Sequence, residues 1–147
     1  MKRKILTSCL QQVSDKLKSL KSAIADLQES AGEDSKSSVG DKYETSRAMI
    51  HLEQENLMTQ YNEMIKVHGL LSQIRSDTVL DVGMVGALIE TNNGNFYISV
   101  GLGKIDLDGY SVFAIAPNSP IGSAFLGKKV GEKIELNGRD YTITKIQ

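Results

Sequence analysis

The sequence predicts an α+β protein, in which an N-terminal antiparallel coiled-coil helical hairpin precedes an antiparallel β domain with one short helix. Two observations predict this fold class. Apolar residues of the first half recur at steps of three and four, the period of a helix, whereas those of the second half alternate at the strand period of two. The 13 glycines of the 147 residues also crowd into the second half. We therefore expect a hairpin over residues 1–76 and a separately folding β domain over residues 77–147.

Each helix of the hairpin is predicted by an apolar seam with heptad spacing. The first seam consists of Leu10, Val13, Leu17, Leu20, Ile24 and Leu27, and the second of Ile50, Gln54, Leu57, Tyr61, Met64, His68 and Leu71. Residues 32–40 are small, polar and helix-breaking, so the first helix should end near Gly32 and the tip should lie near residues 32–44. Two amphipathic helices with so short a connection bury their seams against each other.

The β domain is predicted from alternating runs and turn signals. We expect strands at residues 84–90, 96–100, 110–116, 133–136 and 141–146. Asn92-Asn93-Gly94 and Asn137-Gly138 are hairpin-turn signals. Between the third and fourth strands, Ser119 fits an N-cap, Pro120 the first helical position and Gly127 the residue after the C-cap, which together predict one short helix.

Composition excludes several classes of function. A net charge of −1 gives no general attraction to nucleic acid or to an anionic membrane. The single cysteine, Cys9, excludes an internal disulfide and suits a reducing cytoplasm, where we expect the protein to be located. A secretory signal needs an apolar run of about 7–15 residues, and here only Ile5 and Leu6 precede polar residues. His51 and His68 lack the spacing of metal ligands, and both belong to the hairpin rather than to any catalytic triad.

One motif in the second half is more specific. Ser119-Pro120-Ile121-Gly122, followed by Phe125-Leu126-Gly127-Lys128 and then Gly131-Glu132, resembles the C-terminal signature of bacterial Gre transcript-cleavage factors. The order of hairpin and β domain is similar too, so the resemblance covers nearly the whole chain. It implies an FKBP-like β domain, and it implies that Ser119, Pro120, Ile121 and Gly122 anchor the protein to RNA polymerase.

The resemblance also assigns a role to the hairpin tip. In the Gre family the hairpin enters the secondary channel of RNA polymerase, and two acids in a Gly-Asp-Leu-Ser-Glu-Asn context help to hold a catalytic Mg²⁺. This sequence has Gly40-Asp41-Lys42-Tyr43-Glu44-Thr45, so Asp41 and Glu44 match the two acids. It differs from the family at Lys42, Tyr43 and Thr45, and at Ser123, where the family has Arg.

The function implied is that of an elongation factor that stimulates cleavage of backtracked transcripts. Such a factor is not itself an enzyme. It binds no cofactor alone, shares Mg²⁺ with the polymerase active site, and meets nascent RNA or DNA only through the polymerase complex, without a membrane.

Alternatives remain open both for the tip acids and for the function of the whole protein. Asp41 and Glu44 also fit a capping box, as N-cap and third residue of the second helix. Glu33 and Asp34 form a further acidic pair that could replace or assist them. For the whole protein, the alternatives are a secondary-channel regulator without cleavage activity and a peptidyl-prolyl isomerase, which would need a pocket of clustered aromatic side chains.

Overall fold

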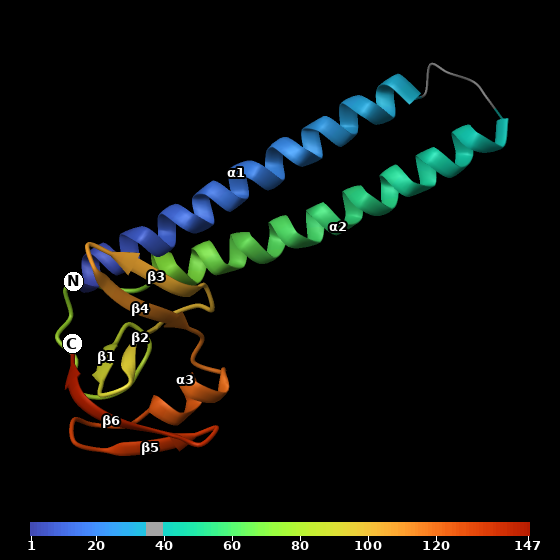
Figure 1. The fold of residues 1–147 in the computed structure, drawn as a ribbon. Coiled ribbons are helices and arrows are strands. Elements are labelled where there is room, and N and C mark those ends of the chain that lie inside the picture. Colours follow the sequence, from blue (N-terminus) through green and yellow to red (C-terminus); the bar gives the residue numbers. More distant parts are fainter. Residues whose placement is uncertain (35–39) are drawn as a thin grey trace. The chain divides into compact units, whose positions relative to one another are not determined.

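The computed structural model describes residues 1–34 and 40–147, with side chains outside residues 32–43. It has an α+β fold in which two long helices, α1 (Lys2–Asp34) and α2 (Gly40–Ser72), precede a six-stranded sheet and a short helix (Figure 1). The chain divides into two compact units. One is Gln12–His68, and the other combines Met1–Gln11 with Gly69–Gln147.

The unit Gln12–His68 is a pair of antiparallel helices packed along the predicted seams. In the part of α1 that belongs to this unit, Val13 and Leu20 are buried and the other seam residues are half-buried. Every seam residue of α2 from Ile50 to His68 is half-buried, while the positions between them are mostly exposed. The heptad prediction is confirmed. Burial is incomplete because only one partner helix covers each seam.

Helix α1 continues to Asp34, beyond the end expected near Gly32. A single glycine inside a helix costs about 1 kcal/mol relative to alanine, which the packing of an adjacent seam offsets. Among the described residues, no helix is long and apolar enough to cross a membrane.

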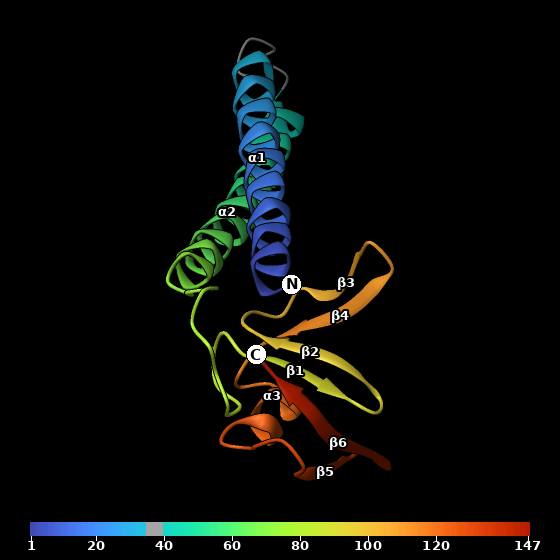
Figure 2. The same cartoon turned by 90° about the vertical axis from the view of Figure 1, so that its left-hand side faces the viewer.

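The sheet follows α2 in the chain. Its strands are β1 (Leu88–Thr91), β2 (Gly94–Ile98), β3 (Gly103–Leu107), β4 (Tyr110–Ile115), β5 (Lys133–Leu136) and β6 (Arg139–Ile146), and the short helix α3 (Pro120–Phe125) lies between β4 and β5. The strand order is β3-β4-β2-β1-β6-β5 (Figure 2). The expectation of a wholly antiparallel domain is wrong at one place, because β2 pairs with β4 in parallel. The chain between them forms β3, which supplies the crossover that a parallel pair requires.

Tight turns set the register of the sheet. Asn137 and Gly138 both have positive φ, of 52° and 76°, and join β5 to β6 with Leu136 opposite Arg139. This is the two-residue hairpin turn that the sequence predicts. Asp108 and Gly109, with φ of 50° and 81°, make an equivalent turn between β3 and β4 that the sequence analysis did not use.

One face of the sheet carries the main apolar cluster. Its buried members are Ala87, Ile89, Phe96, Ile98, Phe125, Ile134, Tyr141 and Ile143. Phe125 of α3 is fully buried, and its ring centroid lies 5.2 Å from that of Phe96 and 6.3 Å from that of Tyr141. This aromatic contact fixes α3 on the sheet.

The opposite face is buried as well. Leu88 is opposite Tyr97 in the β1–β2 pair, and Tyr97 is opposite Ala114 in the β2–β4 pair, so all three share this face and none is more than 2% exposed. The first turns of α1 belong to the same compact unit, with Ile5 and Cys9 fully buried. Burial raises the pKa of Tyr97, and the nearby Cys9 thiol raises it further. The start of α1 therefore covers this face.

This packing changes the predicted division of the chain. We expected the hairpin and the β domain to share few core residues across a boundary after Ser76. Instead, Ile5, Cys9 and Leu71 are fully buried in the unit that contains the sheet. The reason is physical: a sheet with apolar side chains on both faces needs a cover on each.

Candidate functional site

The predicted tip acids lie at the adjoining ends of the two long helices. Glu33 and Asp34 are the last two residues of α1, whereas Asp41 and Glu44 are the second and fifth residues of α2. The side chains of Glu33, Asp34 and Asp41 lie outside the described residues. The Glu44 side chain is exposed. The helix ends thus bring the four predicted acids into the same part of the hairpin.

The two acidic pairs differ in their relation to the helix dipoles. Asp41 and Glu44 begin a helix, where the positive end of the dipole stabilises a negative charge. Glu33 and Asp34 end a helix, where a negative charge is unfavourable, and the described last turn holds no basic residue. Asp41 and Glu44 can therefore stabilise the start of α2, whereas Glu33 and Asp34 destabilise the end of α1.

The capping-box interpretation of Asp41 stays a prediction. Asp41 is the second residue of α2 (Gly40–Ser72), and its side chain lies outside the described residues. Asp41 and Glu44 remain three positions apart in one helix, the spacing of neighbours on a helix surface. Both charges still favour the start of α2 through its dipole.

The predicted magnesium ligands cannot be built into a site from the described atoms. Among the described side chains, no group of three or more His, Cys, Asp and Glu residues is placed to hold a metal ion. Two carboxylates that complete the shell of an ion held elsewhere need no such group, since Mg²⁺ keeps several waters and shares ligands. The assignment of Asp41 and Glu44 as ligands within a polymerase complex stays a prediction.

The second predicted site is the turn that leads into α3, which is built around Ser119. The Ser119 hydroxyl accepts a hydrogen bond from the Gly122 amide at 3.1 Å and donates one to the Ala116 carbonyl oxygen at 2.6 Å. Pro120 occupies the first helical position, and Gly127 adopts a φ of +77° after the C-cap. The caps predicted from the sequence are confirmed.

The same geometry explains the glycine of the motif. A Cβ added to Gly122 would lie 2.0 Å from the Ala116 carbonyl oxygen, so only glycine allows α3 to approach the preceding chain this closely. Ser119 and Gly122 therefore have a local structural role that requires no partner.

The four predicted docking residues differ in exposure. Pro120 is exposed, Ser119 is half-buried and Gly122 is buried. Ile121 is half-buried and packs against the main apolar cluster. Leu126, which the motif includes but which was not among the predicted docking residues, is the C-cap that follows α3 and is 42% exposed. The accessible outer surface of α3 and its C-cap is thus formed by Pro120, Ser123 and Leu126.

The aromatic side chains of the β unit do not form an open pocket. The rings of Phe96, Phe125 and Tyr141 contact one another at centroid distances of 5.2–6.3 Å inside the core. A prolyl-peptide site needs ring faces that a ligand can reach. In this cluster the ring faces pack against neighbouring side chains. The isomerase alternative therefore has no support here.

Comparisons with known proteins add no assignment. No protein-family model matches the sequence, and no curated protein matches it.

Proposed function

We propose that this protein is an RNA polymerase accessory factor of the Gre kind, which inserts its hairpin into the secondary channel and stimulates cleavage of backtracked transcripts by the polymerase. One observation carries the proposal. In the unit Gln12–His68, two antiparallel helices carry Glu33 and Asp34 at the end of α1 and Asp41 and Glu44 at the start of α2. At 1.5 Å per residue, the parts of α1 and α2 within this unit are about 35 Å and about 44 Å long. An arm of this length suits delivery of carboxylates to a distant active site.

The arm is proposed to supply only metal ligands. Two-metal phosphodiester hydrolysis needs a second Mg²⁺ near the scissile phosphate and a positioned water. Asp41 and Glu44 would add oxygen ligands to an ion that the polymerase already holds in part. The polymerase would supply the catalytic centre, so the factor needs neither a pocket nor a resident cofactor. We place this activity in the cytoplasm, with RNA polymerase as the direct partner.

Attachment to polymerase is assigned to the outer surface of α3. The Ser119 cap and the buried Phe125 fix this helix on the sheet, which leaves Pro120, Ser123 and Leu126 exposed. Ile121 is a poor probe because it packs against the core. Leu126→Asp should weaken capture of polymerase while the protein stays folded. Val130→Asp is the matched control, since Val130 is 56% exposed and lies outside α3. Equal capture by both variants would remove this assignment.

The decisive experiment measures transcript shortening in stalled, backtracked polymerase complexes at matched occupancy. Asp41→Asn and Glu44→Gln each remove one formal charge, and each should reduce cleavage on the order of tenfold or more. Glu53→Gln is the control, because Glu53 is an exposed acid of α2 nine residues beyond Glu44 and thus about 14 Å along the helix. It should leave cleavage unchanged.

The same assay separates the alternatives. Wild-type protein that binds polymerase without shortening the transcript would refute the cleavage role and favour a channel regulator, a reading that the differences from the family at Lys42, Tyr43 and Thr45 support. Full activity in the Asp41→Asn, Glu44→Gln double variant would move the role to Glu33 and Asp34.

A further inference from the structure

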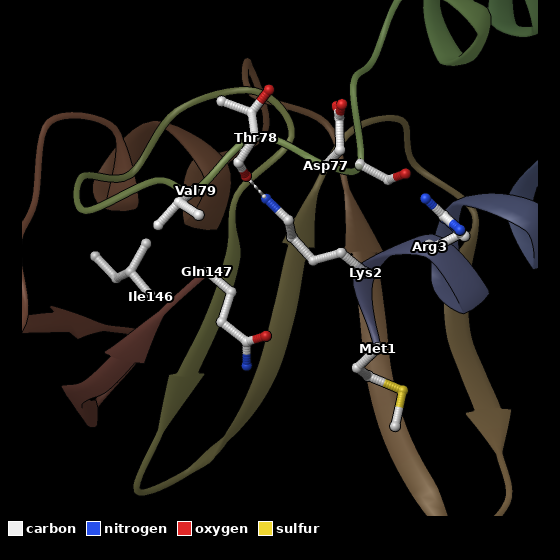
Figure 3. Close-up of a pocket in the computed structure, with 9 residues that line it drawn as sticks. Met1, Lys2, Arg3, Asp77, Thr78, Val79, Ile146 and Gln147 are labelled. Carbon is white, nitrogen blue, oxygen red and sulfur yellow. Dashed lines mark hydrogen bonds between the residues drawn. The ribbon is translucent and has the colours of Figure 1, made fainter.

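A cavity of about 300 Å³ lies within the unit that contains the sheet, far in sequence from the hairpin tip. Three segments line it: residues 1–3 at the start of α1, residues 76–79 of the segment that leads to the sheet, and residues 146–147 at the end of β6 (Figure 3). A volume of roughly 300 Å³ is at the small end of the range for ligand pockets. The cavity could therefore hold a small metabolite.

A buried lysine, Lys2, lines this cavity. Lys2 is only 6% exposed, and its Nζ donates a hydrogen bond of 2.6 Å to the Thr78 carbonyl oxygen (Figure 3). Burial lowers the pKa of the Lys2 ammonium, an effect that the charge of Asp77 partly opposes. An ammonium can donate three hydrogen bonds. A negatively charged ligand would satisfy the remaining donors and offset the cost of burial.

The charges around Lys2 leave an excess of positive charge. Arg3 also lines the cavity, and its side chain has no ion pair or hydrogen bond to the described part of the chain. The Asp77 carboxylate at the cavity offsets one of these two charges, and it also pairs with the exposed Arg75 at 3.6 Å. In addition, the first turn of α1 contains no acid, so Lys2 and Arg3 add to the positive end of the helix dipole. Cations in this position oppose the usual preference for negative charge at a helix start.

The uncharged part of the lining is mixed: Met1, Val79 and Ile146 are apolar, whereas Ser76, Thr78 and Gln147 are polar (Figure 3). Val79 is 92% exposed and therefore lies at the mouth of the cavity. A ligand with a charged head and a short apolar body would match both parts of the lining.

We propose that this cavity binds a small organic anion, whose phosphate or carboxylate group is held by Lys2 and Arg3 and whose apolar body contacts Val79 and Ile146. The inference does not depend on the polymerase role. The competing explanation is that Lys2 only ties the start of α1 to residues 76–79 through its bond to Thr78. That explanation accounts for Lys2 but not for the unpaired Arg3 beside it.

The test uses the full chain with three probes: inorganic phosphate, monobutyl phosphate and pentanoate. Binding is followed by titration calorimetry and by the NMR shifts of the backbone amides of residues 76–79. Monobutyl phosphate and pentanoate share an apolar body but differ in head group, so the tighter of the two identifies the preferred oxyanion. Inorganic phosphate should bind more weakly than monobutyl phosphate, because it lacks the body. Equal affinity for these two would overturn the assignment of the apolar walls.

Arg3→Gln is the main variant, because the Arg3 side chain is exposed and makes no contact that the fold requires. Loss of one charge-assisted contact should weaken binding on the order of tenfold. Lys4→Gln is the matched control: it removes the same charge one residue later, from a side chain that pairs with Asp108 at 3.6 Å and does not line the cavity. It should change affinity by about twofold or less.

Lys2→Met provides a second test, since it keeps the apolar stem and removes the charge. A folded Lys2→Met protein should lose binding. If this variant does not fold, the comparison of Arg3→Gln with Lys4→Gln decides. Absence of binding by every probe at millimolar concentration would overturn the proposal. Equal weakening by Arg3→Gln and Lys4→Gln would do the same, because it would reduce the effect to general surface charge.

Discussion

The α-carbon of Gly122 lies so close to the Ala116 carbonyl oxygen that a Cβ added to the glycine would be 2.0 Å from that oxygen. Both atoms belong to the backbone, so a flexible side chain cannot move to relieve the clash. Ser119 adds to this contact, because its hydroxyl donates a hydrogen bond to the same oxygen. The entry into α3 is therefore a place where a single methyl group decides the local fold.

We expect Gly122→Ala to lower the free energy of unfolding by about 1–3 kcal/mol, the usual cost of forcing atoms into a well-packed site. The matched control is Gly69→Ala in α2, where an added Cβ would meet no atom within 4 Å. That change should stabilise the protein by about 0.5–1 kcal/mol, since alanine favours a helix interior. Urea denaturation measures both. A Gly122→Ala protein as stable as wild type would contradict the close approach.

The tip acids should have opposite effects on helix stability. Joint neutralisation by Glu33→Gln and Asp34→Asn should stabilise the end of α1 by about 0.3–1 kcal/mol per charge, and Asp41→Asn should destabilise the start of α2 by a similar amount at low salt. Thermal melting followed by helix circular dichroism compares the variants. High salt should reduce both differences, because it screens exposed charges. Changes of the same sign would show that the dipoles do not govern the tip.

The buried thiol of Cys9 should make stability depend on pH in the alkaline range. Burial raises the pKa of Cys9 from 9.0 to about 11. Below pH 9 the thiol is protonated in both states and its contribution is complete. Between pH 9 and 11 only the unfolded chain releases the proton, so the free energy of unfolding should fall as pH rises, by about 2–3 kcal/mol in total.

The control for this pH dependence is Cys9→Ala. It should abolish the fall in stability between pH 9 and 10, measured by urea denaturation at each pH. Burial also raises the pKa of Tyr97 and Tyr110, which adds to the fall in stability above pH 10. Burial lowers the pKa of Lys2 from its ordinary 10.5, so Lys2 makes stability rise with pH in this range and cannot mimic the fall assigned to the thiol. A slope that persists in Cys9→Ala at pH 9–10 would assign the effect to another group.

The fragment of residues 77–147 should not fold as the sequence analysis expected. Without the start of α1, the face of the sheet that carries Leu88, Tyr97 and Ala114 would be exposed to water. A chain in which a short glycine-rich loop joins Asp15 to Ile65 keeps this cover and should melt cooperatively. Calorimetry of both proteins tests the difference. Cooperative melting of the 77–147 fragment alone would restore the simpler division of the chain.

The elements that could be predicted are those with strong local signals. The seams of α1 and α2 follow directly from heptad spacing, and the ends of α3 follow from Ser119, Pro120 and Gly127, because capping is a property of a few neighbouring residues. The turn at Asn137-Gly138 was predicted for the same reason.

The features that were missed depend on contacts between distant segments. Nothing local in residues 96–98 reveals that β2 pairs with β4 in parallel. Strand β3 is short and mostly exposed, and its one clear signal is the Asp108-Gly109 turn. Likewise, Lys2 resembles any N-terminal lysine until Thr78, 76 positions later, approaches its ammonium group. Asp41 and Glu44 were found by a motif, whereas the cavity beside Arg3 exists only in three dimensions.

The grouping of Met1–Gln11 with Gly69–Gln147 has a consequence for the order of folding. During synthesis the first turns of α1 emerge well before the sheet whose face they cover. The intervening helices pack through an antiparallel turn and can form as soon as α2 is complete, since contacts close in sequence form fastest. Once formed, this hairpin holds residues 11 and 69 near each other, so joining the chain's start to its later part costs less loop-closure entropy than an unstructured connection would. Formation of the helical hairpin thus favours the later packing of residues 1–11 with residues 69–147.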